Sequence, residues 1–194
     1  VRIINYYKKF GYKDFLIASG YKSKIIEAYF KKNLLDLNIK VVNTGTKTMT
    51  GGRIRRLHKF LKKERFLLTY GDGLCSVNLK NLVNFHLKNK NYITLTAVRP
   101  PARFGGVKII GSKVNYFKEK SSLDEGWING GFFVVEPEIF NFLKSDKTIL
   151  EKSPLEKICK LKKLGAYKHN KFWQCMDTIR DIVILEDAVK KKFI

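Results

Sequence analysis

Residues 66–73 read FLLTYGDG, and this stretch decides the fold. Five apolar or β-prone side chains in a row predict a buried strand over residues 66–70, and the Gly-Asp-Gly that follows predicts a turn. In open α/β sheets, ligands bind at the carboxyl ends of parallel strands, and Asp72 stands at such an end. We therefore interpret Asp72 as a carboxylate that holds a divalent metal carrying a nucleotide phosphate. A plain turn aspartate is the alternative, because Asp and Gly are common in turns.

Expected helices and strands alternate on both sides of this stretch. We expect strands over residues 14–18, 39–43 and 92–98, and helices over residues 1–10, 23–32, 53–61 and 79–89. We also expect Ser23 to cap the second helix. This β-α-β alternation predicts an α/β fold with a three-layer, mostly parallel, Rossmann-like sheet.

The pattern changes after Pro100-Pro101. Shorter strands are expected over residues 106–110, 113–120 and 127–135, then a short helix over 137–143. These strands predict a small antiparallel extension. Ser153-Pro154 predicts the start of a helix that ends near Gly165, and a strand near Tyr167 precedes the last helix. We interpret residues 1–194 as a single domain.

A second carboxylate stands far along the chain, in FWQCMDT at residues 172–178. Asp177 precedes the last expected helix, so an N-cap carboxylate is one interpretation. Mg²⁺ is usually held by one or two carboxylates together with substrate phosphate oxygens. Asp177 is therefore a candidate partner for Asp72 in one magnesium site.

Residues 48–53, TMTGGR, are a candidate anion site. Glycines placed before a helix leave backbone N–H groups open to a phosphate, and the helix dipole favours an anion there. Arg53 adds a guanidinium for a phosphate or a base edge. A flexible surface loop is the alternative, and the Lys-Ser/Thr of a P-loop is missing.

The composition describes a basic globular protein. The chain has 39 Lys and Arg residues against 17 Asp and Glu, a net charge of +22, and 44% hydrophobic residues. Most of the basic residues are Lys and are scattered, which indicates a solvated surface rather than a dedicated nucleic-acid face. The sequence has no apolar run of membrane-spanning length, and its three cysteines are not spaced as zinc ligands. We expect reduced thiols and a cytoplasmic location. His58, His86 and His169 have no partner at ligand spacing, and we expect them to be surface or helix residues.

Several stretches together resemble the sugar-phosphate nucleotidylyltransferases, most closely the branch that uses CTP and glucose 1-phosphate. They are residues 19–22 (SGYK), 43–45 (NTG), 49–53 (MTGGR), 69–73 (TYGDG), 100–105 (PPARFG), 119–120 (EK), 128–133 (INGGFF) and 172–181 (FWQCMDTIRD). The resemblance covers nearly the whole chain.

The resemblance implies that Mg²⁺ lies between Asp72, Asp177 and the α-phosphate of CTP, while glucose 1-phosphate attacks in line and diphosphate leaves. It places Thr48, Arg53 and Gly71 at the nucleotide and Lys120 at the sugar phosphate. It places Gly105, Glu119 and Asn129 along the sugar. It also implies a homo-oligomer that makes CDP-sugars for a surface polysaccharide such as lipopolysaccharide O-antigen, with no nucleic-acid or membrane partner.

The family begins with a strand and a glycine-rich loop that would precede Val1. We therefore expect the domain to be truncated at its N-terminus and also at its C-terminus, and this fragment alone to show little or no activity. Three alternatives stay open. One is a related enzyme that uses UTP, dTTP or GTP, or a mannose 1-phosphate substrate. The others are a basic nucleic-acid-binding module and a non-catalytic remnant that binds sugar nucleotides.

Overall fold

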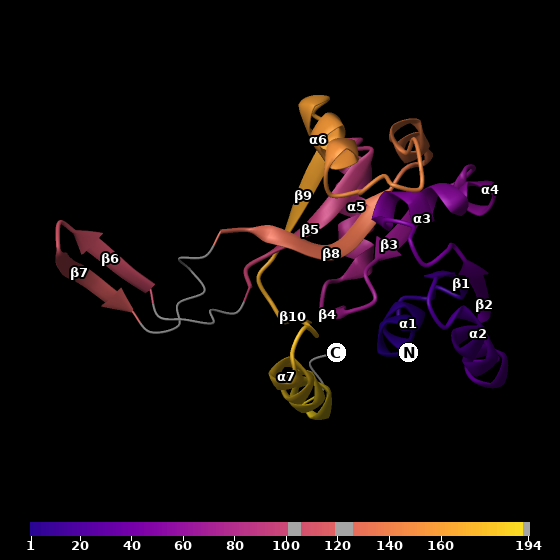
Figure 1. Ribbon diagram of the computed structural model, residues 1–194, viewed down its shortest axis with the longest axis horizontal. Helices are drawn as coiled ribbons and strands as arrows, with labels where there is room; N and C mark the ends of the chain where they lie inside the picture. Colours follow the sequence, from indigo (N-terminus) through magenta and orange to yellow (C-terminus); the bar gives the residue numbers. More distant parts are fainter. Residues whose placement is uncertain (101–105, 119–125, 192–194) are drawn as a thin grey trace. The chain divides into compact units, whose positions relative to one another are not determined.

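A computed structural model describes residues 1–100, 106–118 and 126–191 (Figure 1). The chain divides into two compact units. The first contains Val1–Leu68, Leu79–Thr94 and Phe133–Gly165, and the second contains Thr69–Asn78, Leu95–Phe132 and Ala166–Ile194. No helix in the described ranges is long and apolar enough to cross a membrane.

The described elements alternate much as the sequence predicts. The strands are β1 (Asp14–Ser19), β2 (Asn38–Asn43), β3 (Phe66–Thr69), β4 (Gly73–Cys75), β5 (Ile93–Val98), β6 (Gly106–Ile110), β7 (Lys113–Lys118), β8 (Ile128–Val135), β9 (Leu164–His169) and β10 (Trp173–Cys175). The helices are α1 (Arg2–Lys8), α2 (Ser23–Lys32), α3 (Thr50–Arg56), α4 (His58–Leu61), α5 (Leu79–Asn89), the 3-10 helix η1 (Pro137–Phe142), α6 (Ser153–Lys160) and α7 (Ile179–Lys190).

Strand pairing confirms a mixed α/β fold. β1 and β2 are parallel, with Asp14 opposite Asn38 and Ser19 opposite Asn43, and α2 connects them. The predicted antiparallel extension is the β6–β7 hairpin (Figure 1). The described strands form four hydrogen-bonded sheets rather than one, because β1 pairs with β2 whereas β3 pairs with β8.

The largest sheet has four strands in the order β3-β8-β5-β9. The N–H of Glu136, after the end of β8, donates to the carbonyl of Tyr92, just before β5, at 2.8 Å. Tyr92 in turn donates to Lys163, just before β9, at 2.9 Å. β8 therefore runs opposite to β5, and β9 runs with β5. The side chains of β8 from Phe132 to Val135 are fully buried, as an apolar strand inside a core should be.

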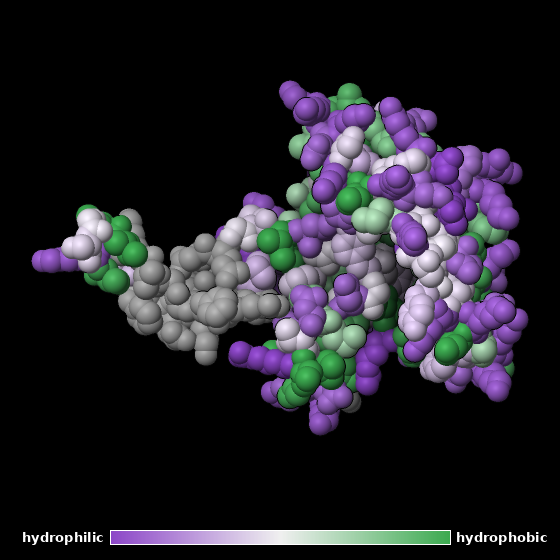
Figure 2. All heavy atoms as spheres, viewed as in Figure 1, coloured by the Kyte–Doolittle hydropathy of each residue, from purple (hydrophilic) through white to green (hydrophobic). Residues whose placement is uncertain are grey.

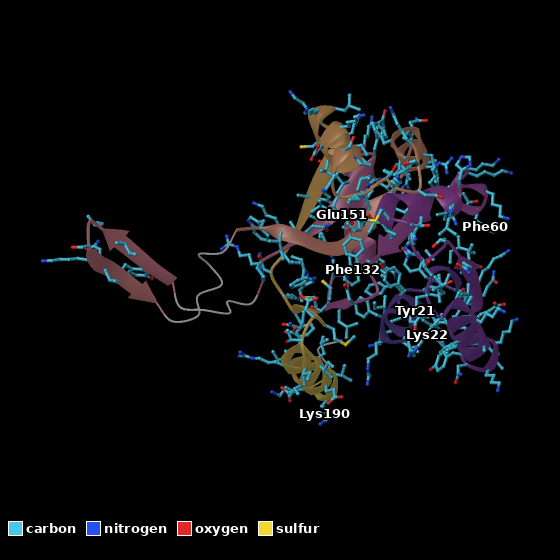
Figure 3. All side chains as sticks on the ribbon, viewed as in Figure 1. Tyr21, Lys22, Phe60, Phe132, Glu151 and Lys190 are labelled. Atoms are coloured by element: carbon cyan, nitrogen blue, oxygen red, sulfur yellow. The ribbon has the colours of Figure 1, made fainter. Side chains whose placement is uncertain are left out.

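Several predicted helix ends are wrong. Lys22, labelled with Tyr21 in Figure 3, is the N-cap of α2 with φ 56°, while the Ser23 hydroxyl bonds that of Ser19 at 2.7 Å. The helix that starts at Ser153 ends at Lys160, and Gly165 belongs to β9. A Cβ at Gly165 would overlap Asn91, so this glycine permits close packing of a strand rather than ending a helix.

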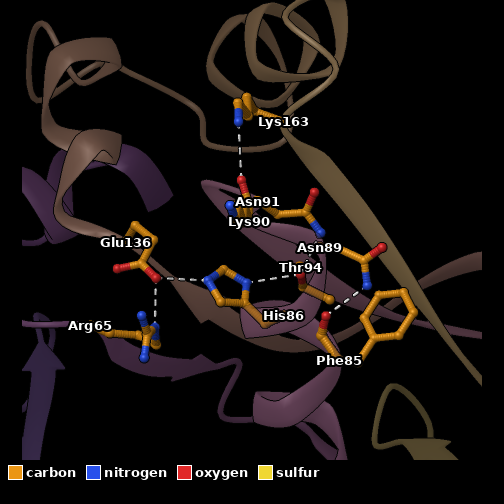
Figure 4. A network of polar contacts seen from close by, with 9 residues as sticks. All are labelled: Arg65, Phe85, His86, Asn89, Lys90, Asn91, Thr94, Glu136 and Lys163. Atoms are coloured by element: carbon orange, nitrogen blue, oxygen red, sulfur yellow. Dashed lines mark hydrogen bonds and ion pairs between the residues drawn. The ribbon is translucent and has the colours of Figure 1, made fainter.

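Two of the three histidines expected at the surface or on helices are buried: His86 does lie on a helix, α5, whereas His169 lies on β9. His86 is 1% exposed and lies between Thr94 Oγ1, 2.8 Å from Nδ1, and Glu136 Oε1, 3.0 Å from Nε2. Arg65 donates to the same Glu136 oxygen at 2.6 Å (Figure 4). Burial lowers the pKa of His86 below its usual value. His169 is also buried, and burial lowers its pKa too. We interpret His86 and His169 as structural groups, since both side chains are buried.

Hydrophilic side chains cover much of the face shown in Figure 2. The apolar core lies mainly on α5, β5, β8 and the segment that follows β8, with buried Leu79, Leu82, Ile93, Phe133 and Ile139. Burying such side chains stabilises the fold by about 1.5–3 kcal/mol each, relative to exposure.

Candidate active site

The β4–β10 ribbon brings the two predicted metal carboxylates to neighbouring segments. Its strands are antiparallel, with Cys175 opposite Gly73. One residue beyond this pair, the N–H of Met176 donates to the carbonyl oxygen of Asp72 at 2.8 Å. Asp72 precedes β4 and Asp177 follows β10, so both exposed aspartates leave the same end of the ribbon.

A buried carboxylate holds the turn that carries Asp177. Asp181 is 5% exposed, and its Oδ1 accepts from Gln174 Nε2 at 2.8 Å. Its Oδ2 accepts from the N–H of Asp177 at 3.2 Å and from the N–H of Thr178 at 2.9 Å. Thr178 caps α7 and forms a capping box with Asp181. The interpretation of Asp177 as the N-cap is therefore wrong, because the N-cap is the next residue, Thr178.

Cys175 links this turn to Asp72. Its Sγ donates to Asp177 Oδ2 at 3.1 Å, and the residue lines a small pocket together with Asp72. Burial, followed by the hydrogen bond and charge of Asp177, raises the pKa of the Cys175 thiol to about 11. The thiol is therefore protonated at neutral pH and acts as a hydrogen-bond donor.

The pocket has a volume of about 130 Å³. Its lining residues are Tyr70, Asp72, Gly73, Asn129, Gly130, Gly131, Phe132, Trp173 and Cys175. This volume is below the roughly 300 Å³ of the smallest common ligand pockets, so it suits one group of a larger ligand.

Close backbone approach shapes the pocket. Gly131 has φ +77°, and a Cβ there would lie 2.8 Å from Tyr70 Cδ2, so glycine is required on both counts. Asn129 Oδ1 accepts from the N–H of Gly131 at 3.0 Å, and Asn129 Nδ2 donates to Tyr70 Oη at 3.4 Å. Trp173 Nε1 donates to the Gly130 carbonyl at 2.8 Å. Asn129 thus lies in the same pocket as Asp72, beside the glycines that the sequence singled out.

The donors present suit a hard cation. Asp72 and Asp177 offer carboxylate oxygens from adjacent segments, and Mg²⁺ typically takes one or two carboxylates plus water and phosphate oxygens. Among the described residues, no group of three or more His, Cys, Asp or Glu side chains could enclose a metal. A closed zinc site, which needs four protein ligands, therefore does not fit these residues.

The three residues predicted to contact the nucleotide, Thr48, Arg53 and Gly71, differ in their burial and in their contacts. Thr48 is buried, and Arg53 Nη1 donates to the Ser19 carbonyl at 3.1 Å and to Thr44 Oγ1 at 2.7 Å. Arg53 therefore lies at the carboxyl ends of β1 and β2, where ligands bind in such sheets. Gly71 is exposed, and a Cβ there would meet nothing within 4 Å.

The expectation that Gly51 and Gly52 precede a helix with free amides is wrong. Both lie inside α3, which starts at Thr50, and the N–H of Gly52 donates to the Thr148 carbonyl at 3.1 Å. A Cβ at Gly52 would collide with the backbone of Asp146. These glycines serve helix–loop packing, which the local sequence does not reveal.

Thr48 and Arg53 belong to the first unit, whereas Gly71, Asp72, Asn129 and Asp177 belong to the second. Gly105, Glu119 and Lys120 lie outside the described residues.

Sequence reasoning missed the roles of Gln174, Cys175 and Asp181. The Thr-x-x-Asp spacing at 178–181 is a capping-box pattern, and it would have identified Asp181.

Parallel strands with polar residues at their carboxyl ends are typical of α/β proteins that bind nucleotides. Residues 3–183 match the family model described as nucleotidyl transferase, and the chain belongs to this family.

Similar proteins agree with this assignment. The chain is 37% identical, over 97% of its length and 82% of the relative's, to glucose-1-phosphate cytidylyltransferase of Salmonella typhimurium. It is 33% identical, over 82% of its length and 72% of the relative's, to D-glycero-alpha-D-manno-heptose 1-phosphate guanylyltransferase of Campylobacter jejuni. The crystal structure of HddC from Yersinia pseudotuberculosis shares the fold, with a TM-score of 0.74 and 20% identity over 97% of this chain and 84% of HddC. The chain is thus a nucleotidyltransferase of the sugar-phosphate class, as the sequence predicted.

Proposed function

We propose that the chain is a glucose-1-phosphate cytidylyltransferase, which converts CTP and α-D-glucose 1-phosphate to CDP-glucose and diphosphate. The observation that carries the proposal is the placement of Asp72 and Asp177 at the same end of the β4–β10 ribbon, where Met176 N–H donates to the Asp72 carbonyl. The identity of 37% to a cytidylyltransferase, against 33% to a guanylyltransferase, favours cytidine as the base.

In this reaction, a phosphate oxygen of glucose 1-phosphate forms a bond to the α-phosphorus of CTP as the bond to the β-phosphate oxygen breaks. The two substrates are polyanions, so positioning and charge neutralisation supply most of the catalysis. Asp72 and Asp177 would hold Mg²⁺, which supplies positive charge at the α-phosphate. Cys175 donates to Asp177 Oδ2 and so orients that carboxylate.

The other residues are proposed for the two substrates. Thr48, Arg53 and Gly71 would contact the nucleotide. Asn129, at the pocket, would contact the sugar, together with Gly105 and Glu119, and Lys120 would face the sugar phosphate. We further propose a cytoplasmic homo-oligomer that serves CDP-sugar synthesis for a surface polysaccharide.

Binding selectivity tests the proposal. Isothermal titration calorimetry with Mg²⁺ should show CTP binding at least about tenfold more tightly than UTP, dTTP or GTP, and glucose 1-phosphate more tightly than mannose 1-phosphate. Tighter binding of another nucleotide would assign a related reaction. A nucleic-acid-binding module would instead bind RNA or DNA with a steep salt dependence and show no nucleotide selectivity.

A further inference from the structure

A loop from far along the chain caps the start of α3. Met49, the N-cap residue, makes no side-chain cap hydrogen bond. Its N–H donates to the Asp146 carbonyl at 2.9 Å, and the N–H of Gly52 donates to the Thr148 carbonyl at 3.1 Å. The loop of residues 145–151 therefore takes up main-chain donors that the first turn of a helix otherwise leaves unsatisfied.

Asp146 also holds α3 through its carboxylate. Oδ1 accepts from Arg56 Nε at 3.1 Å, and Oδ2 accepts from Arg56 Nη2 at 2.5 Å. Such a two-point contact fixes the orientation of the planar guanidinium as well as its charge. Arg55 Nη1 is more distant, at 3.7 Å from Oδ1. The hydrogen bond from Arg56 lowers the pKa of Asp146 below its usual value, so the carboxylate is ionised at neutral pH.

Arg56 reaches the loop that carries Thr48. A Cβ at Gly45 would lie 3.1 Å from Arg56 Nη1 and 2.8 Å from Thr48 Oγ1, and Gly45 has φ +89°. Glycine at this position thus lets the guanidinium and the hydroxyl approach the turn that follows β2. Asp146, Arg56 and Gly45 form a row of contacts that ends at Thr48.

Arg53 lies on the same helix as Arg56. The two arginines are three positions apart, so their side chains start from neighbouring places on the surface of α3. Arg53 Nη1 donates to the Ser19 carbonyl and to Thr44 Oγ1. A Cβ at Gly20 would lie 3.0 Å from both terminal nitrogens of Arg53. The position of α3 therefore decides whether Arg53 reaches the carboxyl ends of β1 and β2.

We propose that Asp146 is a positioning residue for the nucleotide, because it holds α3 and Arg56 in the place that Thr48 and Arg53 need in order to contact this substrate. The inference rests on the proposed function, in which Thr48 and Arg53 bind the nucleotide. Asp146 acts through these residues and contacts no substrate itself. Glucose 1-phosphate should not depend on Asp146, since its proposed contact Asn129 belongs to the second unit, whereas Asp146 and α3 belong to the first.

The test measures nucleotide and sugar phosphate binding separately in variants of Asp146. Calorimetry with Mg²⁺ records the affinity for CTP, UTP, dTTP, GTP and glucose 1-phosphate, and circular dichroism checks folding. We expect Asp146→Ala to weaken the best-bound nucleotide about tenfold and to change glucose 1-phosphate affinity by less than about twofold. Asp146→Asn keeps an oxygen acceptor for Arg56, so it should recover part of the loss. Asp36→Ala is the matched control, because Asp36 is an exposed carboxylate of the first unit that pairs with Lys8.

Two further comparisons separate positioning from a general loss of stability. In a double-mutant cycle, Asp146→Ala should add little to the loss of nucleotide affinity once Arg56→Ala is present, because the two side chains act as one unit. Ile158→Val shortens a fully buried side chain on α6, also in the first unit. It should lower stability in urea unfolding while nucleotide affinity stays within about twofold of the parent.

The remaining outcomes are distinct from one another. Tight CTP binding that is undiminished in folded Asp146→Ala would overturn the positioning role and leave the proposed function standing. Tighter binding of another nucleotide, weakened by Asp146→Ala, would keep the positioning role and reject cytidine as the base. Equal losses for nucleotide and glucose 1-phosphate, or an equal loss of nucleotide affinity in Asp36→Ala or Ile158→Val, would make Asp146 a structural residue only. A parent chain that binds no nucleotide would overturn both proposals.

Discussion

The main-chain N–H of Met176 donates to the carbonyl oxygen of Asp72 across 2.8 Å, and this hydrogen bond joins the two segments that carry the proposed metal ligands. Backbone pairing of this kind does not depend on the aspartate side chains. Their carboxylates can therefore be replaced while the ribbon that positions them stays paired.

Asp72→Asn and Asp177→Asn should each abolish most divalent-cation binding, because each removes one of two anionic ligands. We expect Mn²⁺ affinity, measured by electron paramagnetic resonance in the presence of CTP, to fall by about 100-fold, since loss of an outer partner alone costs about 10–100-fold. Asp187→Asn is the matched control, because this exposed carboxylate on α7 pairs with Lys191. Unchanged Mn²⁺ binding in both site variants would refute the two-carboxylate site.

Asp181→Ala should lower both stability and cation affinity. It leaves Gln174 and the amides of Asp177 and Thr178 without their acceptor, and hydrogen bonds to a charged group are worth about 1.5–3 kcal/mol. We expect urea unfolding to show a loss of about that size, and Mn²⁺ affinity to fall by about tenfold because the Asp177 turn is released. A loss of stability with normal Mn²⁺ binding would mean that Asp181 supports α7 but does not position Asp177.

Gly131→Ala should destabilise the second unit by about 1–3 kcal/mol, since the residue has φ +77° and its new Cβ would press on Tyr70. Gly126→Ala is the control, because a Cβ there meets nothing within 4 Å. Thermal unfolding of the two variants checks the difference. Equal melting temperatures would show that the strand adjusts without cost.

Acid should destabilise the protein through His86. Burial lowers its pKa in the folded state, so the unfolded chain takes up the proton first as the pH falls. Stability should be constant above the unfolded value of about 6.5 and decline as the pH drops from there toward the lower folded pKa. His169 titrates in the same sense, so His86→Asn and His169→Asn are compared by urea unfolding at pH 5.5 and 7.5. A pH dependence that survives in the His86 variant but disappears in the His169 variant would reassign the effect.

The thiols should react in the order of their exposure and ionisation. Cys159 is exposed, whereas burial raises the pKa of Cys75 to about 12 and that of Cys175 to about 11. Iodoacetamide at pH 7.5 should therefore modify Cys159 well before the other two, as followed by peptide mass spectrometry. Rapid modification of Cys175 would show that its hydrogen bond to Asp177 is absent in solution. Cys175→Ser, which keeps a donor, should retain Mn²⁺ binding.

The sequence predicted those features that follow from local pattern. Alternating apolar runs and turn residues located most strands within one or two positions. Asp72 was identified because it stands at a strand end, and Asp177 because it is a second carboxylate just before the last helix. Local pattern failed where a distant segment decides the outcome. Gly51 and Gly52 were assigned to a loop because nothing nearby shows that the backbone around Asp146 and Thr148 packs on them. The burial of His86 was not predicted, because its partners Thr94 and Glu136 come from other elements.

Asp181 links α7 to the proposed metal site. The same carboxylate that closes the first turn of this helix also fixes the amide of Asp177. Any cation that tightens the Asp177 turn must then slow amide hydrogen exchange along α7, by linkage between local opening and binding. The protection of α7 amides from hydrogen exchange would then report cation binding, although α7 need not contact the cation.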